Sequence, residues 1–173
     1  MRLADLIDEY IASQSWGNEV TERYETDNTS SYGTILSVAN QSFRLFIDSD
    51  EDRDFLMLYL YAPFSVLDGK SVDAALLFNF MNDNFVYRGR ITVKDDGRIC
   101  YKDIVDVEDV EPPIALIDNM LISGIDFYSR HIEAIAAVAL TQKTYESIRE
   151  EYDKKDAAKE AMEKNKTTEG GED

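Results

Sequence analysis

Apolar and polar residues first alternate with the period of an α-helix and then with the period of a β-strand. Near the start of the chain, apolar side chains recur every three or four positions between acidic ones, which predicts an amphipathic helix near Arg2–Ser13. The segment from Tyr32 to Ala39 then places Thr34, Leu36 and Val38 on one face of a strand, and from Phe43 to Ile47 every second residue is apolar. Two strands are therefore predicted, with a turn at Asn40–Gln41 between them.

The segment from Phe55 to Ala62 is apolar throughout, which is typical of a strand at the centre of a sheet. Pro63 is expected to end this strand, because proline cannot donate to the ladder. Successive side chains of a strand point to opposite faces. The face that suits a helix-covered core carries Leu56, Leu58 and Leu60. The opposite face carries Phe55, Met57, Tyr59 and Tyr61.

We predict that this second face binds a partner. Aromatic and methionine side chains can stay partly wet and still hold an apolar surface. The alternative, left open by the sequence, is that a helix of the same chain or a second copy buries this face.

The segment Ser71–Asn82 is predicted to be a helix that is apolar almost all round. Such a helix needs two surfaces to cover it, and its own sheet supplies only one. The sequence therefore predicts a homodimer whose two-fold interface is built on this helix. The candidates for the side turned away from the sheet are Leu77, Phe78 and Met81.

The second half of the chain repeats the alternation of strands and helices. Phe85–Val93 and Ile99–Val107 are predicted strands, joined by a hairpin turn at Asp95-Asp96-Gly97. A long helix is predicted from Pro113 to Arg149, because proline is tolerated in a first turn and apolar residues follow at helical intervals. Residues 151–173 are expected to extend this helix and then, from about Glu163, to form a disordered acidic tail.

These elements give the order α-β-β-β-α-β-β-α within a single domain over residues 1–150. An antiparallel sheet of about five strands with helices mainly on one face belongs to the α+β class.

The segment Phe78–Val110, FNFMNDNFVYRGRITVKDDGRICYKDIVDVEDV, resembles the YbjN-like family of small bacterial proteins. These proteins are described as regulators of sensory transduction and share the fold of type III secretion chaperones. The residues that carry the resemblance are Asn79, Asn82, Arg90, Asp95, Asp96, Gly97 and Asp103. The resemblance implies that fold and a role in protein binding, and it implies no catalytic residues.

The chain has a formal net charge of −17. Residues 151–173 contain eight acids and five bases and so carry −3, which leaves −14 on the folded part. Such a surface repels phosphate groups, which argues against nucleic acid or a membrane as partner. It favours a basic or amphipathic segment of another protein, although simple solubility explains the charge equally well. One cysteine, Cys100, and the lack of a leader-like or membrane-spanning apolar run predict a cytoplasmic protein.

No pattern of residues predicts catalysis, a metal or a cofactor. The acidic run Asp48–Asp52 lacks the glycine and the distal glutamate of a calcium loop, and His131 is the only histidine. We therefore expect a non-enzymatic, dimeric protein-binding module that acts as a chaperone or a regulatory adaptor. The alternative is a small-ligand sensor or enzyme with a carboxylate-lined pocket, for which the acidic residues between Asp103 and Glu111 are candidates.

Overall fold

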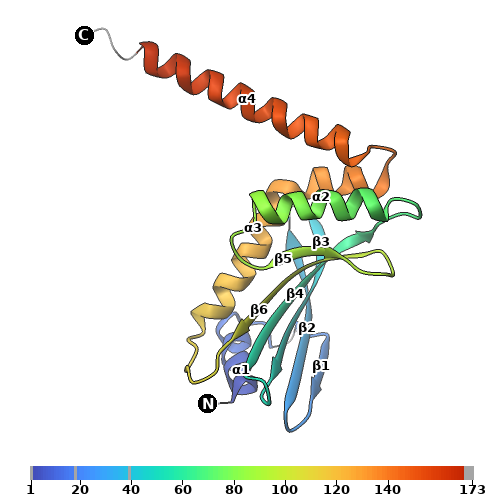
Figure 1. The fold of residues 1–173 in the computed structure, drawn as a ribbon. Coiled ribbons are helices and arrows are strands. Elements are labelled where there is room, and N and C mark those ends of the chain that lie inside the picture. The colour runs from blue at the N-terminus through green and yellow to red at the C-terminus, as the bar shows by residue number, and fades with distance from the viewer. Residues whose placement is uncertain (1, 18, 39, 170–173) are drawn as a thin grey trace.

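The computed structural model describes residues 2–17, 19–38 and 40–169, with the backbone alone for residues 163–169. It shows a twisted antiparallel sheet with helices behind it and at one end (Figure 1). In chain order the elements are α1 (Leu3–Ser13), β1 (Glu22–Glu25), β2 (Thr29–Val38), β3 (Gln41–Asp50), β4 (Phe55–Ser65), α2 (Ser71–Asn84), β5 (Arg90–Val93), β6 (Arg98–Asp106), α3 (Ala115–Leu140) and α4 (Tyr145–Glu169).

The sheet has the strand order β1-β2-β3-β4-β6-β5, and every neighbouring pair is antiparallel. This confirms the α+β class. The described residues form six strands and four helices, where the sequence predicted about five strands and three helices. The additional strand, β1, consists of four exposed residues and has no apolar alternation that could have predicted it.

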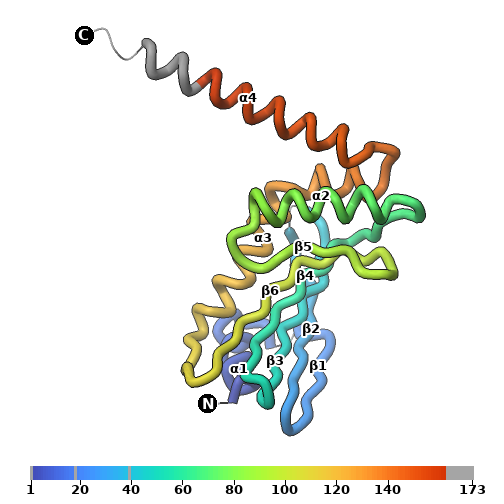
Figure 2. Tube along the Cα trace, in the orientation of Figure 1, coloured from blue at the N-terminus to red at the C-terminus, as the bar shows by residue number. Residues whose placement is uncertain are grey.

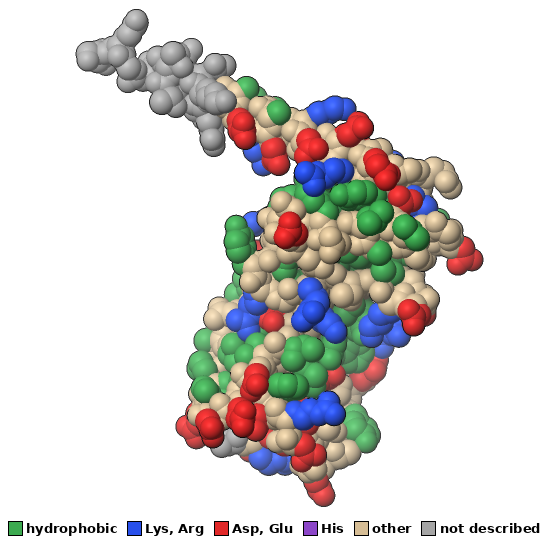
Figure 3. Space-filling view, viewed as in Figure 1, with side chains coloured by type: hydrophobic (Ala, Val, Ile, Leu, Met, Phe, Trp, Pro, Cys, Tyr) green, Lys and Arg blue, Asp and Glu red, His purple; other side chains and the backbone are tan. Residues whose placement is uncertain are grey.

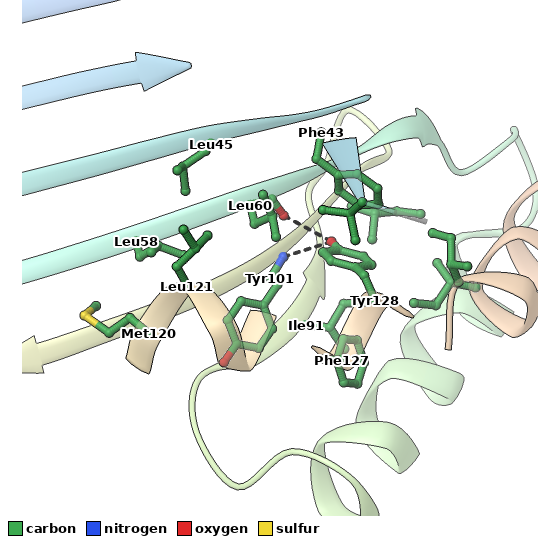
Figure 4. Packing of buried hydrophobic residues seen from close by; sticks show 14 of the residues in the cluster. Phe43, Leu45, Leu58, Leu60, Ile91, Tyr101, Met120, Leu121, Phe127 and Tyr128 are labelled. Carbon is green, nitrogen blue, oxygen red and sulfur yellow. Dashed lines mark hydrogen bonds between the residues drawn. The ribbon is translucent and has the colours of Figure 1, made fainter. Parts of the chain in front are cut away.

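One face of the sheet, called the inner face here, forms the core with α1 and α3. It carries Phe43 and Leu45 of β3, the three leucines of β4 and Tyr101 of β6, and all of these side chains are buried. Figure 4 shows those of β3, Leu58, Leu60 and Tyr101 packed against Met120, Leu121 and Phe127 of α3. The predicted assignment of the leucine face of β4 to the core is confirmed.

The hydroxyl of Tyr128 ties α3 to this core. It accepts a hydrogen bond from the Tyr101 backbone N–H at 3.1 Å and donates one to the Leu60 carbonyl oxygen, also at 3.1 Å (Figure 4). Leu60 and Tyr101 are directly opposite one another on β4 and β6, so one helical side chain bridges two strands. Gly124, one turn earlier on α3, permits this approach, because a Cβ there would lie 2.8 Å from the Tyr101 ring.

Helix α2 is oriented differently from the prediction. Leu77, Phe78 and Met81 are 0%, 2% and 0% exposed, because they face the core. The prediction that these three side chains point away from the protomer is therefore wrong, and they cannot form a dimer interface in this fold. The exposed apolar residues of α2 are instead Val72 and Leu76.

Two predicted boundaries also differ. Strand β4 continues past Pro63 to Ser65, and the β4–β6 register shifts between Tyr61 and Ser65. Proline is tolerated there because regular pairing is already interrupted. Strand β5 begins only at Arg90, because the preceding residues form a loop. The predicted strand residue Ala39 lies outside the described residues.

The predicted helix Pro113–Arg149 is two helices, α3 and α4, with a corner at residues 141–144. The corner is held by the start of α2. Lys70 Nζ donates to Asp73 at 2.6 Å and to the Lys143 carbonyl at 2.7 Å, and Asp73 accepts from the Tyr145 N–H at 2.9 Å. Asp73 therefore caps α4 from another helix, and the hydrogen bond from Lys70 lowers the pKa of its carboxyl.

Helix α1 is capped in the same way. Both oxygens of the Glu51 carboxylate, in the β3–β4 turn, accept hydrogen bonds at 3.0 Å from the backbone N–H groups of Leu3 and Ala4.

Helix α4 projects from the body (Figure 2) and continues to Glu169, further than the predicted limit near residue 163. The last four residues of the predicted tail lie outside the described residues.

Residues that carry the family resemblance have clear structural roles. The Asn82 side chain pairs with the Ile91 backbone of β5, accepting at 2.8 Å and donating at 2.9 Å. The buried carboxylate of Asp103 accepts a hydrogen bond from Arg88. Gly97 has a φ of 79°, which the turn requires and other residues rarely adopt.

We predict that Tyr128→Phe destabilises the fold by about 2 kcal/mol, because it removes two buried hydrogen bonds to the backbone. Urea unfolding followed by circular dichroism measures the free energy of unfolding. Tyr87→Phe is the matched control, since that side chain is fully exposed. Equal stabilities for the two variants would contradict the role of the Tyr128 hydroxyl.

Candidate functional site

The second face of the sheet, called the outer face here, is not covered by α1 or α3, which lie behind the sheet (Figure 1). Phe55, Met57, Tyr59 and Tyr61 lie along it on β4 and are named the aromatic strip. All four are partly buried, and none is enclosed in the core. The exposure of this face, left open by the sequence, is thus settled for the protomer: the strip is accessible.

Neighbouring strands extend the strip sideways. Phe46 of β3 lies opposite Tyr59, and its ring meets the Tyr61 ring edge-on with centroids 6.0 Å apart. Ile104 of β6 lies opposite Met57 and is 39% exposed. The Tyr59 hydroxyl donates to the Met57 sulfur at 3.4 Å, and burial raises the pKa of that hydroxyl. The result is a continuous apolar and aromatic surface across three strands.

Cations surround the Tyr61 end of the strip, which is called the basic end. Lys94 Nζ lies 4.9 Å from the Tyr61 ring centroid and donates to its hydroxyl at 2.6 Å. Arg98 lies over the same ring at 5.4 Å, and Arg44 lies over Phe46 at 5.3 Å. Such cation–π contacts are favourable and keep these side chains on the outer face.

Two further cations belong to the basic end. Lys102 lies opposite Tyr59 on the neighbouring strand, and Arg90 lies opposite Lys102 on the next. Side chains directly opposite one another share a face, so Tyr59, Lys102 and Arg90 form one row across the sheet. A shallow hollow at this place is lined by both cations together with Asn82, Gly89, Asp103 and Ile104.

The Phe55 end of the strip is acidic. Asp50 and Asp106 lie opposite Phe55 on either side, and Asp48 lies opposite Met57. Burial raises the pKa of Asp48, although a hydrogen bond from Ser31 opposes this effect. Figure 3 views the molecule from the outer face and shows hydrophobic side chains beside Lys and Arg in the middle, with Asp and Glu gathered toward the lower end.

The predicted acidic binding surface therefore describes only one end of the outer face, because the other end is basic. The sequence showed the net charge and the strip, but not the cations next to the tyrosines. The alternation in β6 could have indicated that Lys102 faces the same way as Ile104. Its alignment with Tyr59 depends on the register between strands, which no local pattern contains.

His131 lies in a second hollow, at the base of α4. Its ring stacks on Phe85 with centroids 4.7 Å apart, and its Nδ1 is 2.9 Å from the Tyr152 hydroxyl. A cavity of about 180 Å³ beside it is lined mainly by aromatic residues, with Arg88, Arg130 and Asp126. Asp126 is the only carboxylate in this lining. An adjoining open hollow along α4 is lined by Glu133, Glu151 and Asp156, but all three are exposed and Glu151 pairs with Lys143, so neither hollow brings buried carboxylates together.

The acidic residues singled out in the sequence are not brought together. Asp103 is buried beneath Arg88, whereas Asp106, Glu108 and Asp109 are exposed along the end of β6 and the following loop. Glu51 in the other acidic run caps α1 and is committed to that role. No group of three potential metal ligands occurs within the described residues.

No family model matches the chain, and comparison with curated proteins finds no match to its sequence. In the part of the chain that the structure describes, no helix combines the length and apolarity needed to cross a membrane.

His131 makes the stability of the fold pH-dependent. Burial, assisted by the charge of Arg130, lowers the pKa of its imidazole from 6.5 to about 4. The unfolded chain therefore binds this proton first as the pH falls. We predict that the His131 contribution to the free energy of unfolding is complete above pH 6.5 and is lost between about pH 6.5 and pH 4.

The measurement is urea unfolding across this pH range for the natural protein and for His131→Phe, which keeps a ring against Phe85 but cannot titrate. Groups common to both proteins cancel in the difference. The variant is expected to lose less stability on acidification. Parallel pH profiles would show that His131 does not contribute.

Proposed function

We propose that the protein is a non-enzymatic protein-binding module that holds a segment of another protein on its outer face. One observation carries this proposal: the aromatic strip lies on the face of the sheet that α1 and α3 leave uncovered. Aromatic side chains dominate the energetics of protein interfaces, and a sheet surface of this kind is rarely left exposed without a use. The resemblance to the YbjN-like family supports a role as a chaperone or a regulatory adaptor.

We further propose that the protein acts as a dimer, with a second copy on the outer surface of α2. Val72 and Leu76 are 72% and 45% exposed, and with Ala75 they form a stripe at positions i, i+3 and i+4. This stripe lines an open groove with Val93, Lys94 and Asp95 of the β5–β6 hairpin. It takes the place of the three buried residues that the sequence indicated.

The binding proposal is tested with a library of random 12-residue peptides displayed on phage and selected on the full-length protein. We predict that the selected peptides dissociate faster from a Tyr59→Ala, Tyr61→Ala variant, by about tenfold or more, because aromatic anchors contribute most to interface affinity. Surface plasmon resonance measures the dissociation rates. Raised salt should mainly slow association.

Tyr87→Ala is the matched control, since this tyrosine is fully exposed but lies in the loop before β5. Circular dichroism checks that each variant keeps its fold. Selected peptides that bind the double variant as well as the natural protein would contradict the assignment of the aromatic strip as the binding site.

The dimer proposal has its own test. Leu76→Asp places a charge in the exposed stripe and should give a folded monomer by multi-angle light scattering. Leu77→Asp should instead prevent folding, because it puts a carboxylate at a position that is 0% exposed. A monomeric natural protein at high concentration would refute this assembly.

A further inference from the structure

We infer that the bound segment is an extended, amphipathic stretch with a fixed order of charge, with its acidic side chains over the Tyr59–Tyr61 end of the strip and its basic side chains over the Phe55 end. This inference rests on the proposed function and adds the chemistry and the orientation of the partner.

The outer face carries a pair of cations with which no described acidic side chain pairs. Arg90 and Lys102 are directly opposite one another on β5 and β6, and like charges in this position repel. Within the described residues, neither makes an ion pair or a hydrogen bond with any acidic side chain. In a chain with a net charge of −17, acidic residues are abundant, yet among the described residues the only one that lines this hollow, Asp103, is buried and paired with Arg88. A carboxylate supplied by a partner would relieve the repulsion.

Some cations of the basic end make an ion pair with a described acidic residue, and others do not. Arg44 pairs with Glu22 at 2.6 Å, and Arg98 pairs with Asp96 at 2.7 Å, so the charges of both are locally balanced. Lys94 binds the Tyr61 hydroxyl and makes no ion pair with any described residue. The basic end therefore presents two cations without an acidic partner among the described residues, Arg90 and Lys102, and beside them Lys94, whose charge also acts on Asp96.

The Phe55 end of the strip is negatively charged. Asp106 is exposed beside Phe55, and no described cation pairs with its side chain. Asp48 accepts a hydrogen bond from Ser31 but also has no ion pair. Asp50 differs, because Arg53 lies 3.8 Å away. Asp48 and Asp106 thus leave a negative end, with Met57 and Ile104 between it and the cations.

The two ends set the length of the partner segment. Phe55 and Tyr61 are six residues apart on one strand, which corresponds to about 20 Å. An extended segment of about seven residues spans this distance, with apolar side chains in its middle and opposite charges at its ends. Reversing its direction would place like charges together at both ends, so the face selects one orientation.

The test applies the same 12-residue phage library in parallel to two charge-reversed proteins. One carries Arg90→Glu and Lys102→Glu on the outer face. The control carries Lys154→Glu and Lys159→Glu on the exposed part of α4, which changes the net charge by the same amount. Peptides selected on the natural protein should have Asp or Glu at one end, Lys or Arg at the other, and apolar residues between.

These peptides should bind the Arg90→Glu, Lys102→Glu protein about tenfold more weakly and the control with little change, because only the first pair of substitutions reverses the charge next to the tyrosines. A fresh selection on the first variant should lose the acidic end and enrich basic residues there. Scrambling the order of the charges within one peptide, with its composition unchanged, should also weaken binding.

The outcomes separate this inference from the proposed function. Peptides that need Tyr59 and Tyr61 but tolerate both the charge reversal and the scrambled order would overturn the inference and leave the binding face in place. Peptides that tolerate the loss of both tyrosines would overturn the proposed function and this inference with it. Basic peptides selected at the Tyr61 end would overturn the inference alone.

Discussion

The arrangement of the whole molecule depends on the Tyr128 hydroxyl, which is buried between two strands. It is held by the Tyr101 N–H and the Leu60 carbonyl, so α3 cannot slide along or roll on the sheet without breaking two buried hydrogen bonds to the backbone. The inner face is thereby assigned to α3, and Gly124 and Phe127 pack against the same part of β6. Because α3 is committed to the inner face, it leaves the outer face open.

The outer face carries three different kinds of surface along the aromatic strip. Its centre is apolar and aromatic, one end is positive and the other negative, and cation–π contacts hold two cations against Tyr61. The overall charge of −17 gives no hint of this local pattern, because the acidic residues are spread elsewhere or serve structural roles, such as Asp103 beneath Arg88. Net charge therefore describes the long-range field of this protein, whereas the register between strands determines its chemistry at close range.

Periodicity predicted the helices, the long strands and the two faces of β4, because these follow from local alternation of apolar and polar residues. It could not predict β1, whose exposed residues Glu22–Glu25 pair with β2 without apolar burial. Periodicity predicted α3 and the start of α4 as one helix, because the corner between them depends on Lys70 and Asp73, which are distant in sequence. Periodicity also assigned the wrong side of α2 to the dimer interface, because a helix that is apolar all round does not reveal which side faces the core.

Both terminal helices receive cap hydrogen bonds from a distant part of the chain. Glu51 supplies both side-chain bonds at the start of α1, which has no local side-chain cap, whereas α4 receives one bond from Asp73 and another from Thr144 just before it. During synthesis, α1 leaves the ribosome before Glu51, so its cap can form only after the turn at the end of β3 has been made. Helix α1 therefore precedes the part of the nascent chain that holds it, the strand pair β3–β4.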